Sequence, residues 1–195
     1  MAALIGCGGQ EDDLGQTDQG GTDKPKESTV SLAPDMVRTA LVSEASAPEG
    51  WGSTFGEVLD GQEAVGTCTG HTEANCGGVI AYGRANYSPN GGTGAVTFHI
   101  YSFQAPDDAR ATMKSTAPSE QELAESGAKP LEISAGAEET TAFTGPEEDE
   151  VVMRVGGVIV RMVSNHPAKK PDLQAFAKIQ IDRVKVVAAG GNPDA

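Results

Sequence analysis

The stretch from Val151 to Val163 constrains the fold of this chain more than any other. Two apolar runs, 151–155 and 158–163, stand on either side of Gly156 and Gly157. A pair of glycines between two such runs indicates a tight β-hairpin turn. Because this is the most hydrophobic part of the chain, we expect the hairpin to lie centrally in a sheet.

A second hairpin is predicted from residues 77–87 and 95–103. The connection between them contains Asn90 and Gly91, a pair that favours a hairpin turn. Apolar and polar side chains alternate along the second of these strands, so one of its faces should lie in the core. The apolar face carries Val96, Phe98 and Ile100, and the other face carries Thr97, His99 and Tyr101.

The remaining periodicity predicts three helices, over 34–43, 106–116 and 171–187. Two weaker strands are expected at 131–134 and 140–143. This order favours an α+β fold, an antiparallel sheet built from hairpins with the helices packed on one face. With 195 residues in the chain, we expect a single domain over 31–190 and a short tail over 191–195.

The chain is acidic, with a formal net charge of −14. Its carboxylates are concentrated in residues 105–150, which hold twelve acidic and three basic side chains. Such a charge repels phosphate backbones, so we expect no nucleic-acid partner.

The N-terminus resembles a bacterial lipobox. Leu4, Ile5 and Gly6 precede Cys7, whose thiol would take a diacylglycerol. A secretory signal also needs an apolar stretch of about 7 to 15 residues, so residues 1–7 are interpreted as a truncated signal. Residues 8–30 are polar and acidic, which predicts a flexible linker. A chance cysteine in a cytosolic N-terminus is the alternative.

The other two cysteines, Cys68 and Cys76, lie in a stretch rich in Gly, Thr and Asn that predicts a loop. In an oxidising compartment they would pair as a disulfide. Zinc binding by both cysteines and His71 is the alternative, although zinc needs a fourth ligand. Since no apolar run is long enough to cross a membrane, anchoring would depend on Cys7 alone.

The lipobox, the acidic linker, Trp51 after a glycine and the hairpin before a terminal helix form a pattern whose domain part covers about residues 31–188. This pattern resembles actinobacterial sensor-domain lipoproteins, which are similar to the extracellular domain of the mycobacterial serine/threonine kinase PknH. The resemblance implies a sensor-like domain with a ligand-sized cleft. It supplies no site residues.

The sequence contains no complete catalytic pattern. Ser126 and Lys129 match the Ser-x-x-Lys pattern of penicillin-binding enzymes. The Lys-Thr-Gly element of those enzymes is absent, and the remaining sequence elements stand in the reverse order. His71, His99 and His166 are scattered along the chain. We therefore expect no catalytic residues, no metal ligands and no cofactor, and we place Trp51, Phe55 and Tyr101 in a ligand-binding cleft.

The resulting hypothesis is a monomeric, lipid-anchored extracytoplasmic lipoprotein with a non-catalytic ligand-binding or sensor-like domain. Its partners would be the membrane, through Cys7, and a small ligand or an envelope protein. An accessory protein that docks on an envelope enzyme or kinase is the alternative, and an envelope hydrolase is the third.

Overall fold

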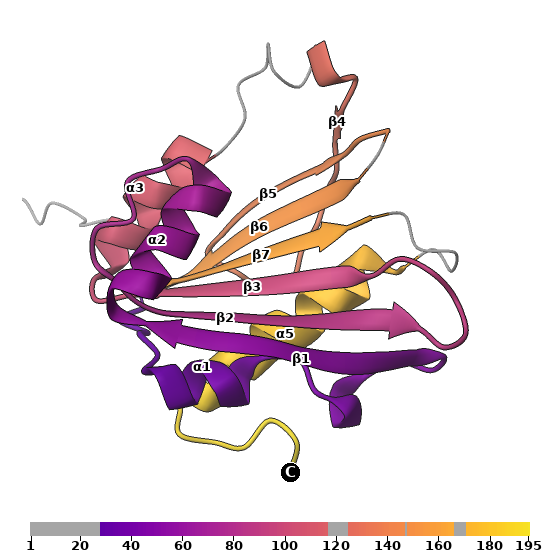
Figure 1. Cartoon of the computed structure of the whole chain (residues 1–195), viewed down its shortest axis with the longest axis horizontal. Coiled ribbons are helices and arrows are strands. Elements are labelled where there is room, and N and C mark those ends of the chain that lie inside the picture. The colour runs from indigo at the N-terminus through magenta and orange to yellow at the C-terminus, as the bar shows by residue number, and fades with distance from the viewer. Residues whose placement is uncertain (1–27, 117–124, 147, 166–170) are drawn as a thin grey trace, which may run out of the picture.

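The computed structural model describes residues 28–116, 125–146, 148–165 and 171–195. Cys7, most of the expected linker and His166 lie outside these residues. Seven antiparallel strands form one sheet in the order β1-β2-β3-β7-β6-β5-β4 (Figure 1). The strands are β1 (Trp51–Asp60), β2 (Val79–Pro89), β3 (Val96–Phe103), β4 (Lys129–Pro130), β5 (Glu139–Thr144), β6 (Asp149–Val155) and β7 (Val158–Ser164).

Both predicted hairpins are present. The β6–β7 hairpin turns at Gly156, whose φ of 57° suits glycine, and β7 is the fourth of seven strands, so the most hydrophobic hairpin does lie centrally. The pairing of β2 with β3 confirms the second hairpin. The strand expected at 131–134 is wrong, because the regular pairing to β5 is confined to Lys129 and Pro130.

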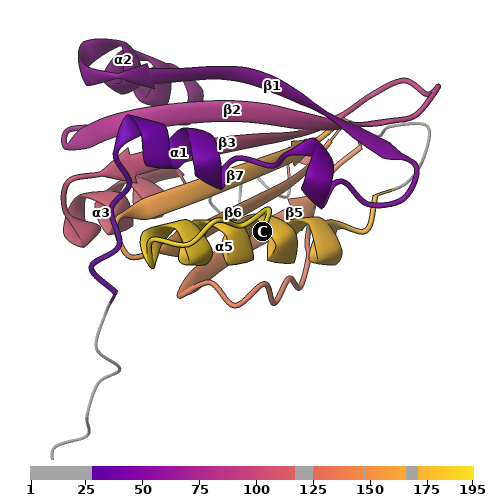
Figure 2. The same cartoon turned by 90° about the horizontal axis from the view of Figure 1, so that it is seen from below.

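Helices cover both faces of the sheet. They are α1 (Pro34–Ala40), α2 (Gly61–Thr72), α3 (Pro106–Thr116) and α5 (Leu173–Ala188). The predicted α+β class is confirmed, but α1 and α5 pack on one face while α2 and α3 pack on the other (Figures 1 and 2). The sheet therefore separates two hydrophobic cores, one on each face. The central strand β7 contributes Val160 to the first core, under α1 and α5, and Ile159 to the second, under α2 and α3.

Two elements are absent from the sequence-based prediction. Strand β1 occupies 51–60, and α2 includes Cys68, which was expected in a loop. Helix α2 contains Gly61, Gly66 and Gly70, which disfavour an isolated helix. Its burial against β2, where Cys68 is fully buried, supplies the stability that its composition lacks.

The first core lies between the sheet and the helices α1 and α5. Helix α1 approaches β2 closely at Gly83, where a Cβ atom would come within 2.5 Å of a Val37 methyl group. Trp51 meets Phe176 of α5 edge to face, with 5.0 Å between the ring centroids. Aromatic and apolar contacts therefore join the first strand, the first helix and the last helix.

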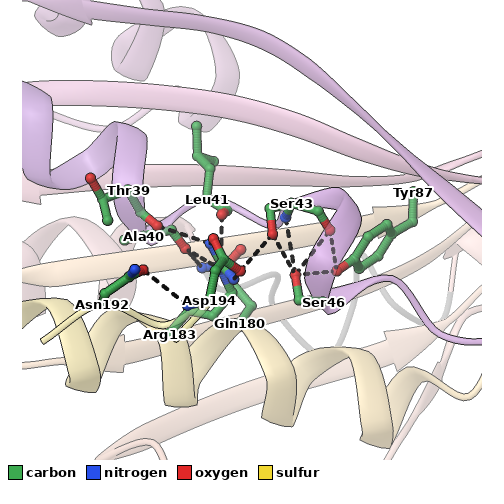
Figure 3. Close-up of polar contacts among 10 residues, drawn as sticks. All are labelled: Thr39, Ala40, Leu41, Ser43, Ser46, Tyr87, Gln180, Arg183, Asn192 and Asp194. Carbon is green, nitrogen blue, oxygen red and sulfur yellow. Dashed lines mark hydrogen bonds and ion pairs between the residues drawn. The ribbon is translucent and has the colours of Figure 1, made fainter.

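Polar contacts fasten α5 to α1 within this layer (Figure 3). The Arg183 guanidinium donates to the carbonyl oxygens of Leu41 at 2.8 Å and Thr39 at 3.0 Å, and the Gln180 amide donates to that of Ala40 at 2.7 Å. These carbonyls belong to the end of α1, where no further helical turn can satisfy them. Asp194, in the stretch expected to be a tail, pairs with Arg183.

No helix among the residues described above is both long enough and apolar enough to cross a membrane.

Candidate functional site

A row of polar side chains crosses the sheet on the face that carries α2 and α3. The strand register places Glu57 opposite Arg84, Arg84 opposite His99, and His99 opposite Arg161. We call these four residues the polar row. Since residues directly opposite one another have Cβ atoms about 5 Å apart, the four side chains are neighbours on one surface.

The helices on this face cover only one end of the sheet (Figure 1). Glu57 and Arg84 are exposed, whereas the Arg161 side chain is 20% exposed and His99 is 8% exposed. Within the described residues Arg84 forms no ion pair. The polar row thus lies at the boundary between the helix-covered part of the face and its open part.

A cluster of two histidines and two tyrosines adjoins the polar row. The His71 Nδ1 atom of α2 lies 2.9 Å from the Tyr101 hydroxyl, and the His99 Nδ1 atom lies 3.0 Å from the Tyr82 hydroxyl. The His71 and His99 rings have centroids 5.0 Å apart. A tyrosine hydroxyl therefore orients each histidine ring through its Nδ1 atom. The Nε2 atoms take no part in these two hydrogen bonds.

Burial keeps this cluster uncharged at neutral pH. Burial lowers the pKa of His99 to about 3, and the neighbouring His71 ring and the Arg161 and Arg84 guanidinium groups add to this effect. Burial also lowers the pKa of His71, and the charges of Arg161 and Arg84 add to that effect. The pKa of Tyr82 is raised to about 12 and that of Tyr101 is raised as well, in both cases chiefly by burial. Both phenols therefore retain their protons.

Arg161 has an internal partner. Its guanidinium donates to both carboxylate oxygens of Glu150, at 2.5 and 3.1 Å. Burial alone would lower the pKa of Arg161. The hydrogen bonds to Glu150 and the charge of that carboxylate outweigh burial and raise the pKa above the ordinary arginine value. Of the two arginines in the polar row, Arg84 is therefore the one that stands open to a ligand.

Further polar groups surround the polar row. Asn86, two residues beyond Arg84 on β2, has a buried side-chain oxygen with no hydrogen-bond partner among the described residues. A surface hollow of about 450 Å³ lies between α3 and β5, on the far side of β6 from the polar row. It is lined by Arg110, Met113, Lys114, Glu139, Thr140 and Thr141. The hollow is therefore separate from the polar row.

The three residues predicted to line a cleft do not come together. Trp51 is 5% exposed in the first core, and Phe55 is 46% exposed, with the Arg38 guanidinium carbon 5.0 Å from its ring centroid. Tyr101 lies in the second core, on the opposite face of the sheet from Trp51. Of the three, Tyr101 alone belongs to the histidine–tyrosine cluster.

The predicted disulfide is present between Cys68 and Cys76. Because it takes both thiols, the zinc alternative with His71 is wrong. No group of three or more potential metal ligands occurs in the part of the chain that the structure describes. The bridge ties α2, which carries His71, to the segment that leads into β2.

Sequence reasoning missed most of this site. The alternation in 96–103 already placed His99 beside Tyr101 on one face. The approach of His71, Arg84 and Arg161 depends on an unpredicted helix and on the register of three strands. No signal local to the sequence encodes that register.

The structure is similar to the extracellular domain of PknH from Mycobacterium tuberculosis. The two share 14% sequence identity with a TM-score of 0.52, and the match covers 81% of this chain and 99% of that domain. No protein-family model and no curated protein matches the sequence. The likeness shows that this chain shares the fold of that domain.

Proposed function

We propose that this protein is a non-catalytic, lipid-anchored extracytoplasmic domain that binds a small polar ligand on the partly open face of its sheet. The observation that carries the proposal is the polar row. Glu57, Arg84, His99 and Arg161 lie side by side on a surface that α2 and α3 cover at one end only. A few polar side chains on an accessible surface fix the orientation of a small ligand.

Two observations support a location outside the cytoplasm. The Cys68–Cys76 disulfide is of a kind that persists in oxidising compartments. The similar fold in PknH belongs to an extracellular domain. The lipobox at Cys7 would supply the membrane anchor.

The non-catalytic part of the proposal rests on the bonding of the histidines. His71 and His99 each contact a tyrosine hydroxyl, and neither forms a hydrogen bond to a serine or a carboxylate among the described residues. The nucleophile, base and acid arrangement that a hydrolase requires is therefore not assembled by these two residues.

The anchor is tested by intact mass. The gene, with its upstream sequence, is expressed in an actinobacterial host beside a Cys7→Ser variant. We expect a diacylglyceryl mass on the wild-type protein alone and, in both, a gain of two hydrogen masses on reduction. An unmodified wild-type N-terminus would refute the anchor, and free thiols would refute the oxidising location.

Ligand binding is tested by backbone amide NMR shifts during a screen of sugars, amino acids, peptides, organic acids and phosphate esters. We expect a hit to shift the amides around Arg84, His99 and Arg161. Trp51 fluorescence is unsuited as the reporter, because Trp51 lies in the opposite core. A complete screen without shifts at the polar row, or with shifts only elsewhere, would contradict the proposal.

A further inference from the structure

The arrangement of positive charge in the polar row is unusual for so acidic a chain. Arg84 and Arg161 occupy the positions on either side of His99. Like charges directly opposite one another destabilise a sheet, and the neutral His99 ring is what separates the two guanidinium groups here. Glu150 neutralises Arg161, whereas Arg84 has no ion pair among the described residues.

Both signs of charge occur at this place. Glu57 lies opposite Arg84 in the strand register, and Glu150 is bonded to Arg161. Glu57 forms no ion pair with Arg84 among the described residues, so the Arg84 guanidinium keeps its hydrogen-bond donors for a ligand on a protein whose net charge is −14.

The hydrogen-bonding groups of Arg84 suit a ligand with anionic oxygen atoms. The Arg84 guanidinium offers several N–H donors and no acceptor, in the planar geometry that matches carboxylate and phosphate oxygens. It is exposed, so binding requires little rearrangement of the sheet. His71 lies at the end of α2 and is exposed beside the same cluster.

We infer that Arg84, which lies beside His99 and adjoins the cluster that contains His71, binds an anionic oxygen group of a small ligand, either a carboxylate or a phosphate. This inference rests on the proposed function, since it names the class of ligand for the same sheet face. Arg84 supplies the principal contact, and Arg161 remains bonded to Glu150.

The test compares Arg84→Gln with Arg38→Gln. Arg38 is the matched control, because it is also an exposed arginine but contacts Phe55 from α1 on the opposite layer. The full chain of each is titrated with inorganic phosphate, with citrate and with uncharged glucose. We expect phosphate or citrate to bind wild type and Arg38→Gln alike, and Arg84→Gln about tenfold more weakly.

Equal binding of the anions by both variants, or no binding of phosphate, citrate or phosphatidylglycerol vesicles, overturns the inference. Glucose shifting the polar row while the anions do not would also overturn it, yet would leave the proposed function intact. A lipid source is distinguished with phosphatidylglycerol and phosphatidylcholine vesicles. Binding that requires phosphatidylglycerol and Arg84 supports the inference and assigns the anionic group to a lipid, whereas binding of free phosphate or citrate assigns it to a soluble ligand.

Discussion

Arg183 holds Asp194 by two parallel bonds, from Nη1 to Oδ1 at 2.5 Å and from Nη2 to Oδ2 at 3.1 Å. The same guanidinium contacts carbonyls at the end of α1, and Ser43 donates to Asp194 at 2.7 Å. Arg183 and this hydroxyl lower the pKa of Asp194. The penultimate residue of the chain is thereby part of the packing between the first and last helices.

Replacing Asp194 by Ala should lower the free energy of unfolding by about 2 kcal/mol, because Arg183 is almost fully buried and would lose its counter-ion. Urea denaturation measures the change. Asp182→Ala is the control, since its pair with Lys178 is exposed and should contribute less than about 0.5 kcal/mol. Equal losses in both variants would show that Asp194 does not fasten the helices.

Acid should destabilise the protein through His99. Its folded pKa of about 3 lies below its unfolded value of 6.5, so the unfolded state takes up the proton first as the pH falls. The contribution of His99 to the free energy of unfolding is complete above pH 6.5. Below that pH it declines by at most about 1.4 kcal/mol per pH unit. Urea denaturation between pH 7 and 4.5 should show a shallower decline for His99→Gln, and parallel curves would contradict the assignment.

Removing the disulfide should cost about 2.5 kcal/mol, because the bridge closes a short loop of sequence separation 8 and restricts the unfolded chain. Thermal melting of Cys68→Ala/Cys76→Ala beside wild type measures this loss. Reductant should lower the wild-type midpoint and leave that of the double variant unchanged. A midpoint in wild type that is insensitive to reductant, once reduction is verified by mass, would disprove the stabilising role.

Trp51 and Phe55 should respond differently to truncation. Trp51→Ala should lower the free energy of unfolding by about 3 to 4 kcal/mol, since it removes a buried ring packed on Phe176. Phe55→Ala should cost less than about 1 kcal/mol, because its ring is half exposed. Chemical denaturation compares the two, and similar costs would be inconsistent with a core role for Trp51 alone.

Local patterns in the sequence predicted the hairpins and the helices at 106–116 and 171–187, because turn residues and periodicity act over short distances. They could not predict α2, whose glycines oppose helix formation until Cys68 is buried and bridged. Of the candidate site, only Tyr101 was expected in a ligand-binding cleft, and His99 was placed beside it on one strand face without a binding role. Its other members come from separate strands and a helix, and their proximity is a property of the assembled sheet.

The chain enters the domain beside the centre of the sheet. The Gly157 amide donates to the Val30 carbonyl at 2.7 Å, and the Leu32 amide donates to the Ser102 hydroxyl at 2.7 Å. Tension applied on the N-terminal side of Ser28 would therefore act first on the contact between Ser28 and Glu138, and then on β3 and the turn before β7. The outer strand β1 receives none of these contacts, so such tension would reach Glu57 only through β2 and β3.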